Sequence, residues 1–250
     1  MNNAIAKLGR DNVCAKAIRY ATELKVPGCL HIEHVCNICC DNPELAPNIN
    51  GRKKKNILSA DQCIEQWVRK FLHGYEERIS KRQSKMPGTV PDDMIDTIIK
   101  MRLPKLSTEQ ANSVVYAHRL GMSAENILGL LLEEFLFQKL SPLGWAMAWG
   151  ETIKSVDFCN ADGSLLQIKN RSNSENSSSS KIRDGKAIKK WFRINAKNGR
   201  CKWEKLSETI GQTVTGLDEE GFRRFVKTTL RKNPEALAIE EVNPWLDFKN

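Results

Sequence analysis

The stretch TIKSVDFCNADGSLLQIKN, residues 152–170, predicts the centre of the fold. Two apolar runs flank Ala161-Asp162-Gly163, and Asp-Gly between such runs is typical of a β-hairpin turn. We therefore expect one strand over residues 152–158, ending near Asp157, and a return strand over residues 164–169. A hairpin of this spacing brings a lone acid beside the return strand.

The return strand carries the triplet Gln167-Ile168-Lys169. Side chains two residues apart on a strand point to the same face, so Gln167 and Lys169 should converge with Asp157. An acid, an amide and a lysine together suit a divalent metal ion, an activated water and a phosphate. We expect Asp157 as the first metal ligand, the Ile168 carbonyl as the second, and Lys169 as the group that orients the water. A cross-strand ion pair on an exposed sheet face is the alternative.

A further acid is expected because the amide of Gln167 binds Mg²⁺ less well than a carboxylate does. Glu125, Glu133 and Glu134 lie on the helix predicted just before the sheet. At about 100° per residue, Glu133 projects away from the centre of the apolar stripe, whereas Glu134 sits at its rim. We therefore expect Glu133 to be catalytic and to bind the metal. In the alternative, both Glu133 and Glu134 are solvated helix charges.

The net charge of +9 is concentrated directly after this hairpin. Residues 165–205 hold twelve Lys or Arg and three Asp or Glu, and the charges of the remaining chain cancel. Such a block is typical of a protein that binds a polyanion, although a solvated basic face would have the same composition. We expect Arg171 and Arg183 to read bases and the lysines at 186, 189 and 190 to meet phosphates. The full set expected to bind DNA is Asn170, Arg171, Ser172, Asn173, Lys181, Arg183, Lys186, Lys189 and Lys190.

Five of the eight cysteines fall early in the chain, with His31 and His34 among them, so a zinc site is one interpretation. The spacing of the cysteines favours a second interpretation, in which they pack as part of an apolar helix face. Residues 32, 35, 36, 39 and 40 follow the period of one apolar helix face, and free cysteine packs as a small hydrophobe.

The order of the predicted elements indicates the fold class. Helical periodicity predicts helices before the hairpin, a strand over residues 144–150, and helices again from Ala187 onward. This order predicts an α/β or α+β fold with a small mixed sheet flanked by helices. Residues 1–105 are expected to form a helical N-terminal region, and residues 106–250 a nuclease core. The predicted helices cover residues 11–25, 30–41, 60–82, 91–102, 108–119, 124–140, 218–231 and 235–241, with N-caps at Ser59, Ser107 and Ser123.

The location of the protein is predicted from two absences in the sequence. No apolar run approaches the roughly 20 residues of a membrane-spanning helix, and the N-terminus has no apolar core of the signal-peptide kind. We therefore expect a cytoplasmic protein without a membrane partner.

These residues resemble a known superfamily. The helix glutamate, Asp157 and the triplet Gln167-Ile168-Lys169 resemble the PD-(D/E)xK nucleases in their Gln-x-Lys variant. Residues 149–158 and 166–180 are similar to the SinI-type family of type II restriction endonucleases, as are the segments around Glu125-Asn126, Phe225 and 233–237. Val156 stands where the superfamily motif has proline.

The resemblance implies a restriction-endonuclease-like core and Mg²⁺-dependent cleavage of both DNA strands at a short symmetric site. In enzymes of the SinI type that site is GGWCC. A homodimer and a separate protecting DNA methyltransferase are implied as well.

Two other functions fit the same residues. A repair, junction-resolving or modification-dependent nuclease would share the fold, and a non-enzymatic DNA-binding protein would use the basic block alone. Discrete fragments from a plasmid would favour the restriction endonuclease over the first alternative. A Lys169→Ala change that altered only DNA affinity would favour the second.

Overall fold

The computed structural model describes residues 1–49, 58–85, 92–172, 185, 187–240 and 243–244. Internal contacts divide the chain into two compact units. Unit 1 combines Met1–Arg78 with Leu132–Phe225, and unit 2 combines Ile79–Leu131 with Val226–Asn250. Two long helices run through both units, and each unit is described by itself below.

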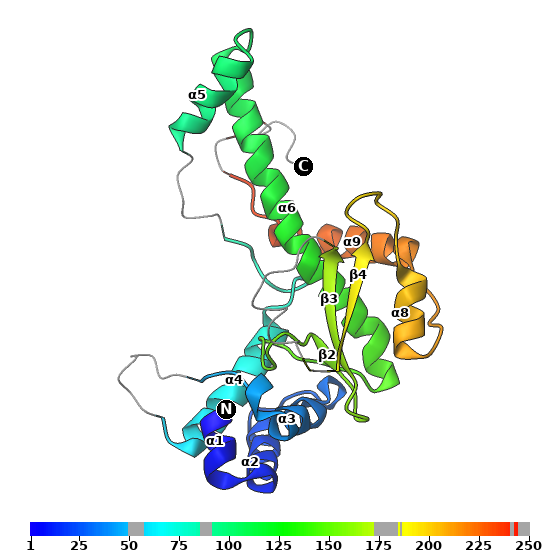
Figure 1. Ribbon diagram of the computed structural model, residues 1–250. Coiled ribbons are helices and arrows are strands. Elements are labelled where there is room, and N and C mark those ends of the chain that lie inside the picture. Colours follow the sequence, from blue (N-terminus) through cyan, green and yellow to red (C-terminus); the bar gives the residue numbers. More distant parts are fainter. Residues whose placement is uncertain (50–57, 86–91, 173–184, 186, 241–242, 245–250) are drawn as a thin grey trace. The chain divides into compact units, whose positions relative to one another are not determined.

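The N-terminal part of unit 1 is helical, as the sequence predicts (Figure 1). The spacing of its apolar residues explains the packing, because α3 buries its Ile, Val and Cys residues on the face predicted from their period. Ser59 begins the fourth α-helix with a reciprocal capping box to Gln62, which confirms that N-cap. The elements are α1 (Asn2–Leu8), α2 (Arg10–Glu23), η1 (Gly28–Leu30), α3 (Ile32–Asp41), η2 (Pro43–Leu45) and α4 (Ala60–Glu76).

A four-stranded mixed sheet follows in the order β1-β2-β3-β4. Its strands are β1 (Ala146–Met147), β2 (Phe158–Cys159), β3 (Leu165–Arg171) and β4 (Ile188–Ile194). The first two pairings are antiparallel, with Phe158 opposite Leu166, and β3 pairs with β4 in parallel, with Gln167 opposite Lys190. The predicted hairpin and the predicted small mixed sheet are therefore confirmed, and the fold is α+β.

Two predictions about the strands were wrong. The segment before Asp157 is a turn-rich connection, in which Glu151 and Ser155 have positive φ, so the strand predicted over residues 152–158 is reduced to Phe158–Cys159. The chain after Ala187 forms β4 before any helix. Two adjacent lysines obscured this strand, but at an outer position in the sheet Lys189 and Lys190 can extend into solvent while Ile188 and Trp191 are buried.

The helices around the sheet also differ in detail from the prediction. One helix, α6 (Thr108–Leu140), replaces the two expected there, and Ser123 lies inside it. Ser107 does cap its start, because the Ser107 hydroxyl accepts from the Gln110 N–H at 3.2 Å. The expected helix over residues 235–241 is a single turn, η4 (Pro234–Ala236), after α9 (Glu219–Lys232). The remaining elements of this part are η3 (Ser141–Leu143) and α8 (Trp203–Ile210).

An aromatic core covers one face of the sheet within unit 1. The ring of Trp191 on β4 lies 5.1 Å from that of Trp203 on α8, and Phe135 on α6 lies 5.4 Å from Phe222 on α9 (distances between ring centroids). Figure 1 shows α8 and α9 beside β4. Because this face carries residues 189, 191 and 193, the opposite face of β4 carries Lys190 and Phe192.

Unit 2 contains α5 (Asp93–Arg102), the first part of α6 and the end of the described chain. Asn233 donates from its side chain to the carbonyls of Ile79 and Arg82, at 3.1 and 2.9 Å. These bonds fix the end of α9 to the segment that begins the unit. Among the described residues, no helix is both long and apolar enough to cross a membrane.

Candidate active site

Asp157 lies immediately before β2 and is fixed to β3 by two hydrogen bonds. Its N–H donates to the Leu166 carbonyl at 2.9 Å, and its Oδ2 accepts from the Ile168 N–H at 2.7 Å. One carboxylate oxygen is thus held by the backbone of the triplet. Because the side chain is only half-buried, it can also face a ligand.

Gln167 and Lys169 lie on the face of β3 that the spacing predicts. Asp157 is one position beyond the pair Phe158–Leu166, so it stands beside Gln167. Gln167 is buried and Lys169 half-buried, and the charge of Lys169 lowers the pKa of Asp157. The hairpin therefore brings the acid, the amide and the lysine together.

Glu133 joins them from α6. The pKa of Glu133 is raised to about 8, first by desolvation and then by the charge of Asp157, whereas the charge of Lys169 lowers it. The neighbouring Glu134 is buried elsewhere in unit 1, with Oε1 3.6 Å from Nε of Arg78. We call Glu133, Asp157 and Lys169 the carboxylate–lysine cluster. Glu133, which helical periodicity favoured, and Glu134 thus have different surroundings, and Glu125 is exposed in unit 2.

The protonation of Asp157 follows from the same surroundings. Desolvation raises its pKa to about 6, whereas the Ile168 N–H and the charge of Lys169 lower it. Glu151 raises the pKa of both Asp157 and Glu133. Carboxylates that hinder one another's ionisation in this way would be stabilised by a cation.

Glu151 is a residue that sequence reasoning missed. It is exposed and has a φ of 55°, a left-handed conformation that non-glycine residues rarely adopt. No sequence signal marks it, because it belongs to neither the hairpin nor the helix before the sheet. Only its electrostatic effect on Glu133 and Asp157 reveals that it lies near them.

The segment 148–157 is braced by the N-terminal helices. The Thr152 carbonyl accepts from Trp67 Nε1 at 3.1 Å and from Cys39 Sγ at 3.2 Å. Gly74 on α4 lies so close to Gly150 that a Cβ added at Gly74 would meet the Gly150 nitrogen at 2.2 Å. One role of the N-terminal helices is therefore to hold the segment that ends at Asp157.

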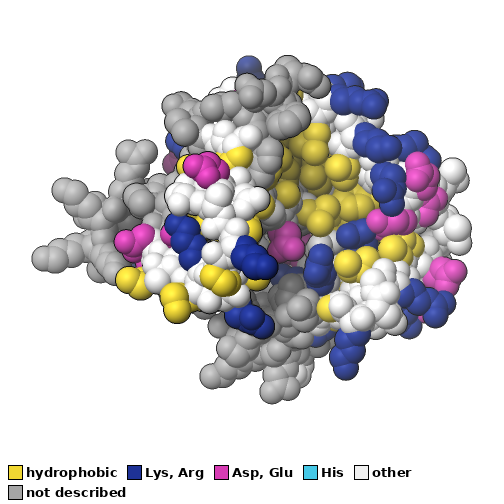
Figure 2. Space-filling view, turned by 90° about the horizontal axis from the view of Figure 1, so that it is seen from above, with side chains coloured by type: hydrophobic (Ala, Val, Ile, Leu, Met, Phe, Trp, Pro, Cys, Tyr) yellow, Lys and Arg dark blue, Asp and Glu magenta, His cyan; other side chains and the backbone are white. Residues whose placement is uncertain are grey.

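The basic residues after the triplet have different surroundings. The side chain of Asn170 accepts from Arg193 Nε at 2.8 Å, and that of Ser172 accepts from the Ala196 N–H at 2.9 Å, whereas Arg171 is exposed. The expected DNA-binding residues Asn173, Lys181, Arg183 and Lys186 lie outside the described residues. In Figure 2, Lys and Arg side chains gather on the side of the view where α8 and α9 lie in Figure 1.

Lys189 and Lys190 occupy a strand rather than the helix expected there, so they point to opposite faces. Lys189 donates to the Thr209 carbonyl on α8 at 3.2 Å. Lys190, opposite Gln167 in the sheet, lies on the face of the carboxylate–lysine cluster, with Nζ 5.0 Å from the centroid of the Phe192 ring.

Comparisons with known proteins relate this chain to one family of restriction endonucleases. The sequence model of the SinI restriction endonuclease family matches residues 15–232. Type II restriction enzyme Eco47I of Escherichia coli is 38% identical over 195 residues, which cover 76% of this chain and 82% of that enzyme. Type II restriction enzyme SinI of Salmonella infantis is 37% identical over 195 residues, with the same coverage.

Proposed function

The chain belongs to the SinI restriction endonuclease family and is a type II restriction endonuclease, and we propose that it cleaves both DNA strands with Mg²⁺ at a short symmetric site rich in G and C. GGWCC, implied by the resemblance to SinI-type enzymes, is the site to test first. Family membership favours this function over a repair nuclease and over a non-enzymatic DNA-binding protein.

The convergence of Glu133, Asp157 and Lys169 is the observation that carries the proposal. These groups come from α6, from the residue before β2 and from β3, yet they interact electrostatically in one place. Two carboxylates beside an amide oxygen are hard donors of the kind that Mg²⁺ prefers. The raised pKa of each carboxyl group supports the fit, because a divalent cation would neutralise their mutual repulsion.

Asp157 and Glu133 would hold the metal, with the Ile168 carbonyl as a further ligand. A bound Mg²⁺ supplies Lewis acidity toward the phosphate and a more acidic water. The protein's own residues supply orientation. The Ile168 N–H fixes one oxygen of Asp157, and Lys169 offers a positive charge on the same face, where it would position a water and the scissile phosphate.

Gln167 and Glu151 modify the environment of this site. The buried amide of Gln167 keeps the position beside Asp157 polar without adding a negative charge. Glu151 adds a negative charge near Asp157 from an exposed position. In our proposal it helps to attract the metal ion, whereas Glu133 and Asp157 bind it.

DNA contacts would extend from the cluster along β3 and β4. Lys190 and Arg171 are exposed, and both lie on the face that carries Gln167 and Lys169. Lysine is well suited to a phosphate, and arginine can bind guanine with two hydrogen bonds. We propose that Lys190 meets the backbone near the cut and that Arg171 reads a base, together with Arg183.

Digestion of a plasmid of known sequence tests this function. The protein with Mg²⁺ should give discrete fragments, and sequencing of their ends should place every cut at GGWCC. Asp157→Asn should give no fragments, whereas Asp162→Asn, in the exposed turn of the same hairpin, should cut as the wild type does. Cuts without a shared sequence, or cuts confined to methylated or branched DNA, would contradict the proposal.

A homodimer is proposed because the described residues of one chain form one such cluster, whereas a duplex break needs two cuts. Two-fold symmetry matches one subunit to each half of a symmetric site. Light scattering of the protein alone and on cognate DNA should show a dimer in at least one state. A monomer in both states would contradict this assembly.

A methyltransferase that blocks the same site is the proposed separate partner, and pre-methylated plasmid should resist digestion.

A further inference from the structure

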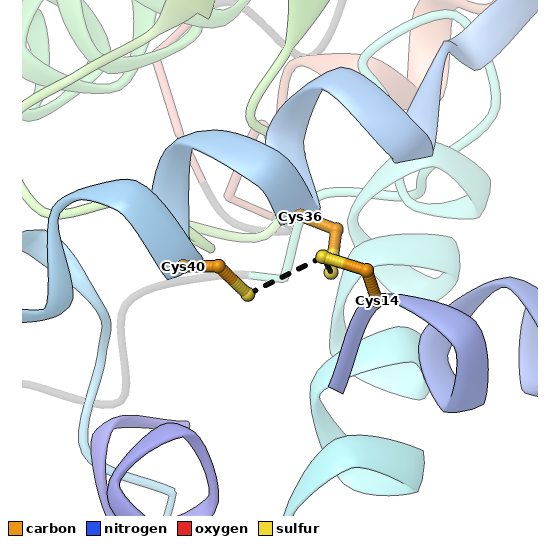
Figure 3. A group of neighbouring side chains, drawn as sticks. All are labelled: Cys14, Cys36 and Cys40. Carbon is orange, nitrogen blue, oxygen red and sulfur yellow. Dashed lines mark hydrogen bonds between the residues drawn. The ribbon is translucent and has the colours of Figure 1, made fainter. Parts of the chain in front are cut away.

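Three cysteine side chains meet between α2 and α3, far along the chain from the residues of the proposed nuclease site. Cys14 extends from α2, and Cys36 and Cys40, four residues apart, extend from one face of α3 (Figure 3). Their Sγ atoms all lie within 4.8 Å of one another. We call these three residues the thiol cluster.

The distances match those of a metal-thiolate site. Cys14 Sγ lies 3.5 Å from Cys40 Sγ and 3.8 Å from Cys36 Sγ. A Zn–S bond of about 2.3 Å at tetrahedral angles separates two ligand sulfurs by about 3.8 Å. Thiols joined only by hydrogen bonds would show similar distances, so the choice of ligand depends on the chemistry of the whole group.

The chemistry favours a metal that prefers sulfur. Three thiols converge from two helices, and the Asn37 side-chain oxygen lies 3.4 Å from Cys14 Sγ, where it or a water could complete a fourth position. The hydrogen bond from Cys36 lowers the pKa of Cys14, which favours a thiolate at that position.

We propose that Cys14, Cys36 and Cys40 form a structural site for a thiophilic divalent ion of the Zn²⁺ class. Each thiol that binds releases its proton to solvent, and the ion links α2 to α3. Cys39, on the same helix, donates to the Thr152 carbonyl at 3.2 Å, so the link would also steady the segment that ends at Asp157. The site differs in chemistry from the carboxylate–lysine cluster, whose oxygen donors suit Mg²⁺.

Cobalt binding tests the proposal directly. The purified full-length protein is stripped with EDTA under reducing conditions and titrated with Co²⁺ alone. We expect one equivalent to bind with the strong sulfur-to-cobalt charge-transfer absorption of a thiolate site, and Zn²⁺ to displace it. Cys14→Ser and Cys40→Ser should lose this absorption, whereas Cys29→Ser and Cys201→Ser, at exposed positions outside the cluster, should retain it.

The proposal is independent of cleavage and can fail by itself. Wild-type protein without the charge-transfer absorption would overturn it, as would absorption that persists in Cys14→Ser. Cobalt bound without that absorption would also overturn it, because this would point to oxygen or nitrogen ligands such as those of His31, Glu33 and His34. Thermal unfolding provides a second readout, since Zn²⁺ should raise the Tm of the wild type and not that of Cys14→Ser.

Discussion

The carboxylate–lysine cluster and the thiol cluster lie in the same unit, but their buried groups are satisfied in different ways. Neutral thiols can donate to one another, as Cys36 does to Cys14 and Cys14 does to Cys40, so the thiol cluster needs no buried charge. Ionised carboxylates cannot donate to one another. Desolvation raises the pKa of Glu133 and of Asp157, and a bound cation would favour the ionised form of both groups. The comparison indicates that unfavourable ionisation of buried groups is a feature of the proposed catalytic site rather than of the thiol cluster.

The largest expected effect is the loss of cleavage on removing the centre of the carboxylate–lysine cluster. Asp157→Ala and Lys169→Ala should each lower the cleavage rate by roughly a thousandfold or more, because each removes a group that acts on the phosphate or its water. Asp157→Ala should also bind DNA more tightly without metal, since it removes repulsion of phosphate. Cleavage rates and gel-shift affinities measure both effects, and a loss of less than tenfold for either variant would rule out that residue.

The next effect separates two neighbouring residues of α6. Glu133→Gln should abolish cleavage or raise the Mg²⁺ concentration needed for it by roughly 10–100-fold, because a metal ligand is weakened. Glu134→Gln should instead lower stability, since it removes the buried carboxylate that pairs with the half-buried Arg78. Mg²⁺ titrations of cleavage and urea unfolding of both variants provide the comparison. A fully active Glu133→Gln beside an inactive but stable Glu134→Gln would reverse the assignment.

A smaller effect should appear as pH dependence of the metal-free protein. Folding raises the pKa of Glu133 to about 8 and that of Asp157 to about 6, above the roughly 4 of an unfolded carboxyl group. Between these values the native state binds more protons, so these two groups lower the free energy of unfolding as pH rises from about 4 to about 8.

Glu133→Gln should flatten this decline, because its amide stays neutral at every pH. Urea unfolding of wild type and variant at several pH values without metal measures the difference, and Mg²⁺ should restore wild-type stability at the alkaline end. A wild type that declines no more than the variant would contradict the desolvation of Glu133 and its interaction with Asp157.

The smallest effects concern DNA binding beside the carboxylate–lysine cluster. Lys190→Ala should weaken binding to all sequences alike and reduce the slope of log affinity against log salt by about one unit. Lys189→Ala is the matched control, because the amine of Lys189 donates to the Thr209 carbonyl on the other face of the sheet. This variant should change the slope less than Lys190→Ala does. Equal slopes for the two variants would show that the face of the strand does not matter.

Arg171→Ala should instead erode the preference for the cognate site over a one-base variant, by about 1–3 kcal/mol of discrimination. Competitive gel shifts with both sites measure this. A uniform loss of affinity with intact specificity would assign Arg171 to the backbone, and base reading would then be sought near Arg223, Arg224 and Lys227.

Some of this molecule is determined by sequence patterns alone. The Asp-Gly turn between two apolar runs fixed the hairpin, because local turn geometry sets the pairing register. The period of two put Gln167 and Lys169 on one face, and the apolar period of α3 predicted which of its residues are buried. These features depend on neighbours close in the chain, so the sequence contains the information for them.

Other features were decided only by tertiary structure. Helix α5 resembles α3 in length and has apolar residues at helical spacing, yet none of its residues is buried, and Ile98 is 67% exposed. Apolar residues at helical spacing predict a helix, but they do not predict whether another element packs against its apolar face. In the same way, β4 became a strand because β3 offered it a partner, despite its two adjacent lysines.

The candidate site shows the same division. Asp157, Gln167 and Lys169 are close because one short turn joins their strands. Glu133 comes from a separate helix. Helical periodicity favoured it over Glu134, but only the packing of α6 places Glu134 beside Arg78 and Glu133 near Asp157. No sequence pattern predicts that Glu151 lies near Asp157 or that Cys14 contacts α3. Long-range packing, rather than any local preference, brings these groups together.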